Sequence, residues 1–466
     1  MSLATTGRSI ARTLLDPTRP VRHRPRPLAV AWLPVAVVVF TFLVPGNFVV
    51  PGPLRSNGSP GRLFSLVCLG LAVLTVVAAA RRRSDTGTPR WSVVGGALVL
   101  YLAAATWSYG VAHTSPLDAA ESAGAQRSLV AVLGLSGVAL YVWLLFRERR
   151  DVDRLLGWVV AAAAFSVVVA LLTQAGVLPS WAALARSTGL VENTSTLRSL
   201  NRLEFTRARG TGQHPLEFSL AITAALPLAL HYARFAATRA ARARSTVAVV
   251  LLLVGVPLAV SRTAILGFAI AAVVAVSIWP AAQKFGAVIA AALAVTAFFV
   301  LAPDLIRSLG AIFTTAQDDN SVTGRLDDYT VVGRMFQENP LVGLGSGVYR
   351  PETGGVFLDN TWLGTIVGAG ALGAAVLALL FLTAGGVAWD RSLLAPDPAA
   401  RSLDRALLAV LGVVLMGSLT SDLMSFQQPT VVFMVVLGVL ASRAGSSRPD
   451  HPSDPPLDLG EARAQR

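Results

Sequence analysis

The chain has 466 residues, of which 54% are hydrophobic and 14% are charged, and its mean hydropathy is +0.61. Water-soluble packing cannot hide this much apolar surface, so the composition excludes an ordinary soluble enzyme and predicts an all-α polytopic membrane protein. The formal charge of +13 fits anchoring to anionic lipid of the inner leaflet. Nucleic-acid binding is not expected, because no nucleic-acid motif accompanies the charge.

Apolar runs of about 17 to 25 residues recur along the chain, which is the length that a helix needs to cross the hydrocarbon core. They are continuous, rich in Ala, Leu and Val, and lack alternation, so we expect helices rather than barrel strands. The sequence predicts about 12 transmembrane helices, near 29–45, 63–80, 91–111, 128–146, 155–176, 215–232, 246–261, 263–280, 285–303, 361–388, 405–424 and 429–442.

The weakest boundary lies between the seventh and eighth predicted helices, where little more than Ser261-Arg262-Thr263 separates two apolar runs. One long kinked helix there would reverse the topology of everything that follows. An outer turn at this point keeps the arginines of 233–245 on the same side as those of 389–405, and therefore favours two helices.

Two tails flank the predicted transmembrane domain 29–442. Residues 1–28 and 443–466 carry too few apolar residues to form a core, so both are predicted to be disordered. With both termini in the cytoplasm, the inner segments hold 26 of the 39 lysines and arginines, which predicts a multi-pass protein of the inner (plasma) membrane. The single cysteine, Cys68, excludes an intrachain disulfide.

Two outer loops, 177–214 and 304–360, are too long to be simple turns, and they face the same side of the membrane. The first ends with Arg207 and Arg209, and the segment 210–215 (GTGQHP) then leads into the sixth predicted helix. Backbone N–H groups at a helix start, with guanidinium groups nearby, predict an anion site. The alternative is a solvated loop that anchors to lipid headgroups.

Arg262 is flanked by apolar residues on both sides and lies at membrane depth or just above it. A charge there costs roughly 2.5 kcal/mol or more on insertion scales, so Arg262 is a candidate functional residue. The alternative is a guanidinium that reaches the outer headgroups along its aliphatic stem.

The second outer loop contains a predicted short amphipathic helix that Gly324 and Arg325 open. Its apolar face is expected to lie flat on the membrane surface, with Arg325 pointing toward the bundle. That face carries Leu326, Tyr329, Val332 and Phe336.

A turn-rich stretch with three alternating glycines, Gly343, Gly345 and Gly347, follows Glu338. The spacing resembles a phosphate cradle, but no strand precedes it, so tight backbone packing is the favoured interpretation. Asp359 and Asn360 then stand at the outer start of the tenth predicted helix, where simple N-capping is the alternative to a functional role.

The order of these pieces resembles the O-antigen ligase and polymerase family of polytopic glycosyltransferases. The resemblance covers about 205–375, and four blocks carry it: Arg209-Gly210 with Gln213-His214-Pro215; Ser261-Arg262-Thr263-Ala264; Gly324-Arg325; and 338–345 (ENPLVGLG) followed by 359–363 (DNTWL) and 370–373 (GALG).

The resemblance implies transfer of a glycan from a polyprenyl-pyrophosphate-linked oligosaccharide to a glycan acceptor, at the outer face of the membrane, with no metal and no cofactor. Arg262 and Arg325 match the two functional arginines of the family, and Asp359 is the candidate base of an inverting transfer. The other expected binding residues for pyrophosphate or glycan are Arg207, Arg209, His214, Glu217, Glu338 and Asn360. Membrane lipids and a chain-length regulator are the further expected partners.

Asp359 stands where the ligases of the family carry a histidine, and exopolysaccharide polymerases look similar to the Asp version. The favoured interpretation is therefore a polymerase that joins repeat units of a surface polysaccharide, and a ligase that transfers finished glycan is the alternative. His214, Glu217 or Glu338 can replace Asp359 as base. A flippase or transporter is the rival of another class, but the chain lacks a convincing internal repeat.

Overall fold

The computed structural model describes residues 29–52, 57–81, 92–193, 201–202, 205–301, 320–350, 358 and 360–442. Each of the predicted apolar segments forms a helix in these ranges. They are α2 (Ala29–Leu43), α3 (Pro60–Arg81), α4 (Val93–Ala112), α5 (Ala119–Leu145), α6 (Arg149–Gln174), α8 (Pro215–Phe235), α9 (Arg239–Leu258), α10 (Arg262–Val276), α11 (Ala281–Leu301), α14 (Thr361–Leu394), α15 (Pro398–Thr420) and α16 (Gln427–Ala441).

The prediction of an all-α polytopic membrane protein is confirmed. Within the described residues, eight helices are long and apolar enough to cross a membrane: α3, α4, α5, α6, α8, α9, α14 and α15. Shorter apolar helices cover Trp32–Leu43, Arg262–Val276 and Gln427–Ala441. Twelve spans therefore remain a prediction, because these three are shorter than a full crossing needs and α11 is not among the eight.

Shorter elements decorate the connections. They are α7 (Trp181–Ser187), α13 (Asn320–Glu338), the 3-10 turn η4 (Leu423–Ser425), and the strands β1 (Phe48–Val49), β2 (Val191–Glu192), β3 (Asn201–Arg202) and β4 (Phe205–Thr206). Strand β1 pairs antiparallel with β2, and β3 pairs antiparallel with β4. The first outer loop is thus tied to the connection that follows α2.

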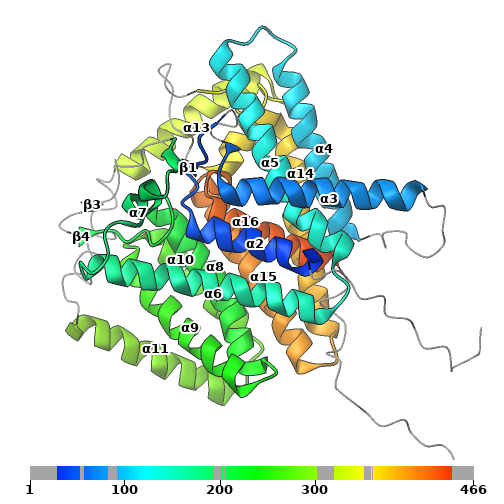
Figure 1. Ribbon diagram of the computed structural model, residues 1–466. Coiled ribbons are helices and arrows are strands. Elements are labelled where there is room, and N and C mark those ends of the chain that lie inside the picture. The colour runs from blue at the N-terminus through cyan, green and yellow to red at the C-terminus, as the bar shows by residue number, and fades with distance from the viewer. Residues whose placement is uncertain are drawn as a thin grey trace, which may run out of the picture.

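Helix α16 forms the centre of the bundle (Figure 1). All of its residues from Gln427 to Ala441 are buried, which is the pattern of a helix enclosed by protein on every side. It packs against α5 and α8, and α15 packs against α8, α10 and α14. Helix α15 therefore runs beside α8, α10 and α14.

Helix α14 is broken, whereas the sequence predicts one uninterrupted helix. Gly370 has φ +64° and ψ −165°, and a Cβ there would lie 2.3 Å from the carbonyl carbon of Leu341. The N–H groups of Ala371 and Leu372 donate to the carbonyls of Pro340 and Leu341, at 2.9 and 3.1 Å. The break admits the neighbouring loop, and only glycine fits there.

The three alternating glycines serve tight backbone packing, as the sequence predicts. A Cβ at Gly345 would lie 2.4 Å from the Cβ of Ala112, and one at Gly347 would lie 2.4 Å from the carbonyl oxygen of Gly124. The N–H of Gly345 donates to the carbonyl of Gly368 at 2.9 Å. The glycine segment is therefore clamped between α14 and the α4–α5 hairpin.

The predicted amphipathic helix exists but is longer than expected, since α13 begins at Asn320. Val332 is 5% exposed and packs with Leu363 and Val367 of α14, whereas Tyr329 is 57% exposed. The predicted apolar face is therefore only partly correct, because Met335 joins this cluster and Tyr329 does not. Contact with the membrane surface stays a prediction.

Several predictions fall outside the described residues. They concern the tails 1–28 and 443–466, the segments 302–319 and 351–357 of the second outer loop, and Asp359. The predicted division between two helices near Ser261 lies within the described residues. It is confirmed, because α9 ends at Leu258 and α10 begins at Arg262.

Candidate active site

Three polar turns meet at one end of the bundle. They are 207–214 before α8, 258–262 between α9 and α10, and 421–428 between α15 and α16. Because α8, α10, α14 and α16 all begin here, four helix N-termini direct the positive ends of their dipoles toward this region. We call this region the polar end.

The first two turns are joined directly. The N–H of Ala208 donates to the carbonyl of Leu258 at 3.0 Å, and Nε of Arg207 donates to the carbonyl of Ala259 at 3.2 Å. Arg207 is 8% exposed, so this contact lies in the protein interior. Two sequence blocks that are some 50 residues apart thus form one unit, and this unit leads directly into Arg262.

The turn before Arg262 is strained. Val260 has φ +42°, a left-handed conformation that is unfavourable for a β-branched residue. The N–H of Val260 donates to the carbonyl of Pro257 at 3.0 Å, and Ser261 caps α10 without a side-chain hydrogen bond. Such strained backbone conformations persist only where the surrounding structure holds them in place, and they cluster at functional sites. Arg262 follows this turn directly, as the first residue of α10.

The turn before α8 is seated on α6. Gly210 has φ +53°, and a Cβ there would lie 2.3 Å from Oγ of Ser166 and 2.6 Å from its carbonyl oxygen. The backbone N–H and the hydroxyl of Thr211 each lie 3.0 Å from the same Oγ and donate to it. A residue larger than glycine at position 210 would therefore displace the whole turn.

Glu217 lies at the centre of these contacts and is fully buried. One carboxylate oxygen accepts the N–H of Gln213 at 2.8 Å, and the other accepts the N–H of Gln428 at 3.0 Å. The side chain of Gln428 in turn donates to the hydroxyl of Thr211 at 3.2 Å. Glu217 therefore joins the turn before α8 to the start of α16, which suits a positioning residue.

His214 is the N-cap of α8. Its Nδ1 accepts the N–H of Leu216 at 3.1 Å, and its ring stacks on Phe426 with centroids 5.6 Å apart. Burial, and then the positive charges of Arg207 and Arg209, lower the pKa of His214 to about 4. The low pKa favours the neutral imidazole at pH 7, and the contact from Leu216 to Nδ1 fits the tautomer that carries its proton on Nε2.

Arg209 adds a second cation to this turn. Burial lowers its pKa; Glu192 raises it, and Arg186 lowers it further. A guanidinium nevertheless stays protonated at neutral pH. The turn before α8 thus presents positive charge beside a neutral histidine, which is a suitable environment for a phosphate group.

Asn360 caps α14, as the alternative interpretation of the sequence predicts. Its Oδ1 accepts the N–H groups of Trp362 and Leu363 at 2.8 and 3.3 Å, and its Nδ2 donates to the carbonyl of Leu419 at 2.8 Å. The hydroxyl of Thr361 donates to the carbonyl of Ser421 at 3.1 Å. The start of α14 is therefore fixed against the end of α15.

The third turn, 421–428, connects the start of α14 with the turn before α8. The N–H of Leu423 donates to the hydroxyl of Thr361 at 2.8 Å, and Nε2 of Gln213 donates to the carbonyl of Ser425 at 2.9 Å. Asp422, just before η4, accepts the hydroxyl of Ser425. A continuous set of hydrogen bonds thus runs from the start of α8 to the start of α14.

These contacts do not bring every predicted residue together. Arg325 lies within the first two turns of α13, and its side chain falls outside the described part of the chain. Glu338, the last residue of α13, is exposed. The packing of Val332 on Leu363 and Val367 places α13 beside the start of α14, and Leu363 lies one helical turn from Asn360.

Ser166 and Gln428 do not stand out in the sequence, although both hold the site together. Ser166 is fully buried in the middle of α6, and Gln428 is 1% exposed at the start of α16. A polar side chain within an apolar helix is costly in a membrane, and that signal could have drawn attention to both residues.

In the comparison with known proteins, a family model matches part of the chain. Residues 247–378 match the family model described as O-Antigen ligase, and this match includes Arg262, Arg325, Glu338, Asp359 and Asn360. The four candidates from Arg207 to Glu217 precede the matched residues. A search of curated proteins gave no match.

The family description favours the ligase-type alternative over the polymerase that the sequence analysis preferred. Members of this family are enzymes, and their substrates are lipid-linked glycans and acceptors. The resemblance that the sequence predicts is confirmed over residues 247–378, which are similar to the O-Antigen ligase family model.

Proposed function

We propose that the protein is a membrane glycosyltransferase of the O-antigen ligase type. It transfers a glycan from a polyprenyl-pyrophosphate carrier to an acceptor sugar at the outer face of the inner membrane. Both termini then lie in the cytoplasm, and the polar end faces outward. The observation that carries the proposal is the convergence of Arg207, Arg209 and the strained turn before Arg262 at the N-termini of α8 and α10.

The pyrophosphate binds where these positive groups gather. Guanidinium groups form charge-assisted hydrogen bonds with phosphate oxygens, and helix N-termini add partial positive charge. Neutral His214 donates from Nε2 to the same anion. In this arrangement Arg262, assisted by Arg325, balances the charge that a metal ion balances in other transferases, so we propose that the reaction is metal-independent.

Transfer proceeds in one displacement. The acceptor hydroxyl oxygen attacks the anomeric carbon, while the bond from that carbon to the pyrophosphate oxygen breaks and its electron pair leaves with the lipid pyrophosphate. Configuration inverts as a result. The hydroxyl proton passes to a carboxylate, for which Asp359 is the proposed acceptor, since it directly precedes the fixed start of α14.

The alternative bases differ in their suitability. Nδ1 of His214 is occupied by the N–H of Leu216, and both oxygens of Glu217 accept backbone N–H groups. Glu338 is exposed and remains the second candidate.

A polysaccharide polymerase is the second candidate function, and Asp359 is the specific observation that favours it. Ligases of the family carry a histidine at this position, whereas the Asp version is similar to exopolysaccharide polymerases. Both reactions use the same donor and the same leaving group. They differ in the acceptor, which is a growing glycan for the polymerase and a different acceptor molecule for the ligase.

The test compares Arg262→Ala and Asp359→Ala with wild type in cells that make the glycan, and lipid-linked and transferred glycans are separated on gels. Arg242→Ala is the matched control, because Arg242 is exposed near the opposite end of α9. At equal protein level, full-length glycan that accumulates on the carrier supports a ligase, and single repeat units on the carrier support a polymerase. Unchanged glycans in Arg262→Ala would contradict both functions.

A further inference from the structure

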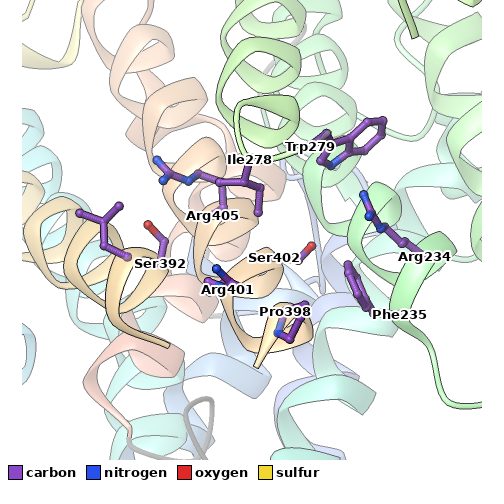
Figure 2. Close-up of a pocket in the computed structure, with 10 residues that line it drawn as sticks. Arg234, Phe235, Ile278, Trp279, Ser392, Pro398, Arg401, Ser402 and Arg405 are labelled. Carbon is purple, nitrogen blue, oxygen red and sulfur yellow. The ribbon is translucent and has the colours of Figure 1, made fainter. Parts of the chain in front are cut away.

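A second site lies at the opposite ends of α8, α10, α14 and α15. A cavity of about 250 Å³ is lined by Arg234 and Phe235 of α8, Trp279 after α10, Ser392 of α14, and Arg401 and Arg405 of α15 (Figure 2). We call this region the arginine end. None of its residues belongs to the polar end, so it is independent of the proposed transfer reaction.

The described lining of this cavity is strongly cationic. It includes three arginines and two serines, and it contains no carboxylate. Asp397, just before α15, is already engaged as its N-cap and accepts the N–H groups of Ala399 and Ala400 at 3.3 and 3.1 Å. The positive charge in the lining is therefore not balanced within the lining itself.

Arg405 is the least solvated of these charges. It is 6% exposed, and its Nε is buried without a hydrogen-bond partner among the described residues. Its guanidinium lies 4.8 Å from the ring centroid of Trp389. A buried donor without an acceptor costs free energy, so a ligand with anionic oxygens would gain by supplying one.

Arg234 is held by aromatic rings. Its guanidinium carbon lies 5.2 Å from the centroid of Phe235 and 5.7 Å from that of Trp279, and Figure 2 shows the side chain beside both rings. Cation–π contacts orient a guanidinium without neutralising its charge. The arginine therefore remains able to bind an anion at the cavity wall.

The residues beside the cavity indicate that its ligand is an amphiphile. Beside the cavity, Leu393 is 57% exposed, Leu394 is 80% exposed and Trp389 is 49% exposed. These residues end a helix that is apolar enough to span a membrane, so they lie at the depth where acyl chains meet headgroups. The cavity is smaller than the roughly 300 to 1,000 Å³ of drug-sized sites, which suits a headgroup better than an oligosaccharide.

We propose that this cavity binds the phosphate of an anionic phospholipid, with its acyl chains along Leu393 and Leu394. The lipid phosphate accepts hydrogen bonds from Arg401 and Arg405, and Arg234 closes the site from α8. A free phosphate compound offers the same anionic oxygens but lacks the chains, so the experiment distinguishes the two sources.

The test is native mass spectrometry of the full-length protein in detergent, titrated with phosphatidylglycerol, phosphatidylcholine or glycerol phosphate. We expect phosphatidylglycerol to bind to wild type more tightly than the other two. Arg234→Gln/Arg401→Gln weakens this binding by about tenfold or more, since both arginines attract the anionic headgroup. Both side chains are exposed, so this variant is expected to fold even if Arg405→Gln does not.

Arg239→Gln/Arg242→Gln is the matched control, because both arginines are exposed on the first turn of α9 and lie outside the cavity. It should bind phosphatidylglycerol as wild type does. Equal binding of phosphatidylglycerol and phosphatidylcholine would overturn the proposal. So would equal losses in the two double variants, or binding of glycerol phosphate as tight as that of the intact lipid.

Discussion

The polar end and the arginine end lie at opposite ends of α8, α10, α14 and α15, yet their polar groups are satisfied differently. At the polar end, Glu217 and Asn360 make hydrogen bonds with other parts of the chain. At the arginine end, Nε of Arg405 is buried without such a partner in the described structure. Among the described residues the polar end also has one such atom, Oε1 of Gln428. Its other contacts still indicate a site that the protein itself preorganises, whereas we propose that a ligand completes the arginine end.

This difference predicts that substitutions at the polar end reduce stability together with activity. Substitutions at the arginine end should instead alter the response to lipid. Three predictions test the first half of this comparison, in order of decreasing expected effect.

The largest effect on stability is expected for Gly210→Ala. The new Cβ would overlap Oγ and the carbonyl oxygen of Ser166, at a left-handed φ that alanine rarely adopts. Strain and overlap together should lower the free energy of unfolding by roughly 2 to 4 kcal/mol. Thermal unfolding in detergent measures this loss.

Gly157→Ala is the matched control, because Gly157 lies on α6 with open space around its Cβ position. It should leave the melting temperature unchanged or raise it slightly. If Gly210→Ala melted at the same temperature as this control, the turn before α8 would not be preorganised.

Glu217→Gln should have the next largest effect. Glutamine keeps one acceptor oxygen but turns an N–H₂ group toward a backbone N–H, so one of the two contacts to Gln213 and Gln428 is lost. A buried donor left unsatisfied costs about 1 to 3 kcal/mol, which limited proteolysis and thermal unfolding can measure. Glu338→Gln, at an exposed position, should show no change.

The smallest effect concerns pH and His214. Its pKa is about 4 in the folded protein and near 6.5 in the unfolded chain, so the unfolded state binds the proton first as the pH falls. The stabilising contribution is therefore complete above about pH 6.5 and is lost progressively toward pH 4. His214→Asn retains an N-cap and should show a shallower fall in melting temperature across this window. Parallel curves for the two proteins would contradict the assignment.

The helices could be predicted from sequence because a membrane requires long, continuous apolar segments, and these are visible without any tertiary information. The short polar interruption at Ser261 likewise predicted the turn between α9 and α10. The order of arginine and glycine blocks was sufficient to place the family, as the match over residues 247–378 confirms.

Features that depend on distant segments could not be predicted. The break at Gly370 exists because Leu341 approaches it closely, and the role of Ser166 depends on the turn at Gly210. Both contacts join residues that lie far apart in the sequence. Helix α13 was predicted too short, since its first turn lacks the apolar periodicity on which the prediction relied. The assignment of Asp359 and Arg325 to the reaction stays a prediction.

The central claim is that glycan transfer occurs at the polar end and depends on Arg262. The most direct test is the rate of transfer from a purified polyprenyl-pyrophosphate-linked glycan to its acceptor, measured for wild type, Arg262→Ala and Arg242→Ala. Loss of one preorganised charge should slow Arg262→Ala by about a hundredfold or more, with Arg242→Ala unchanged. Equal rates for all three proteins would contradict the account.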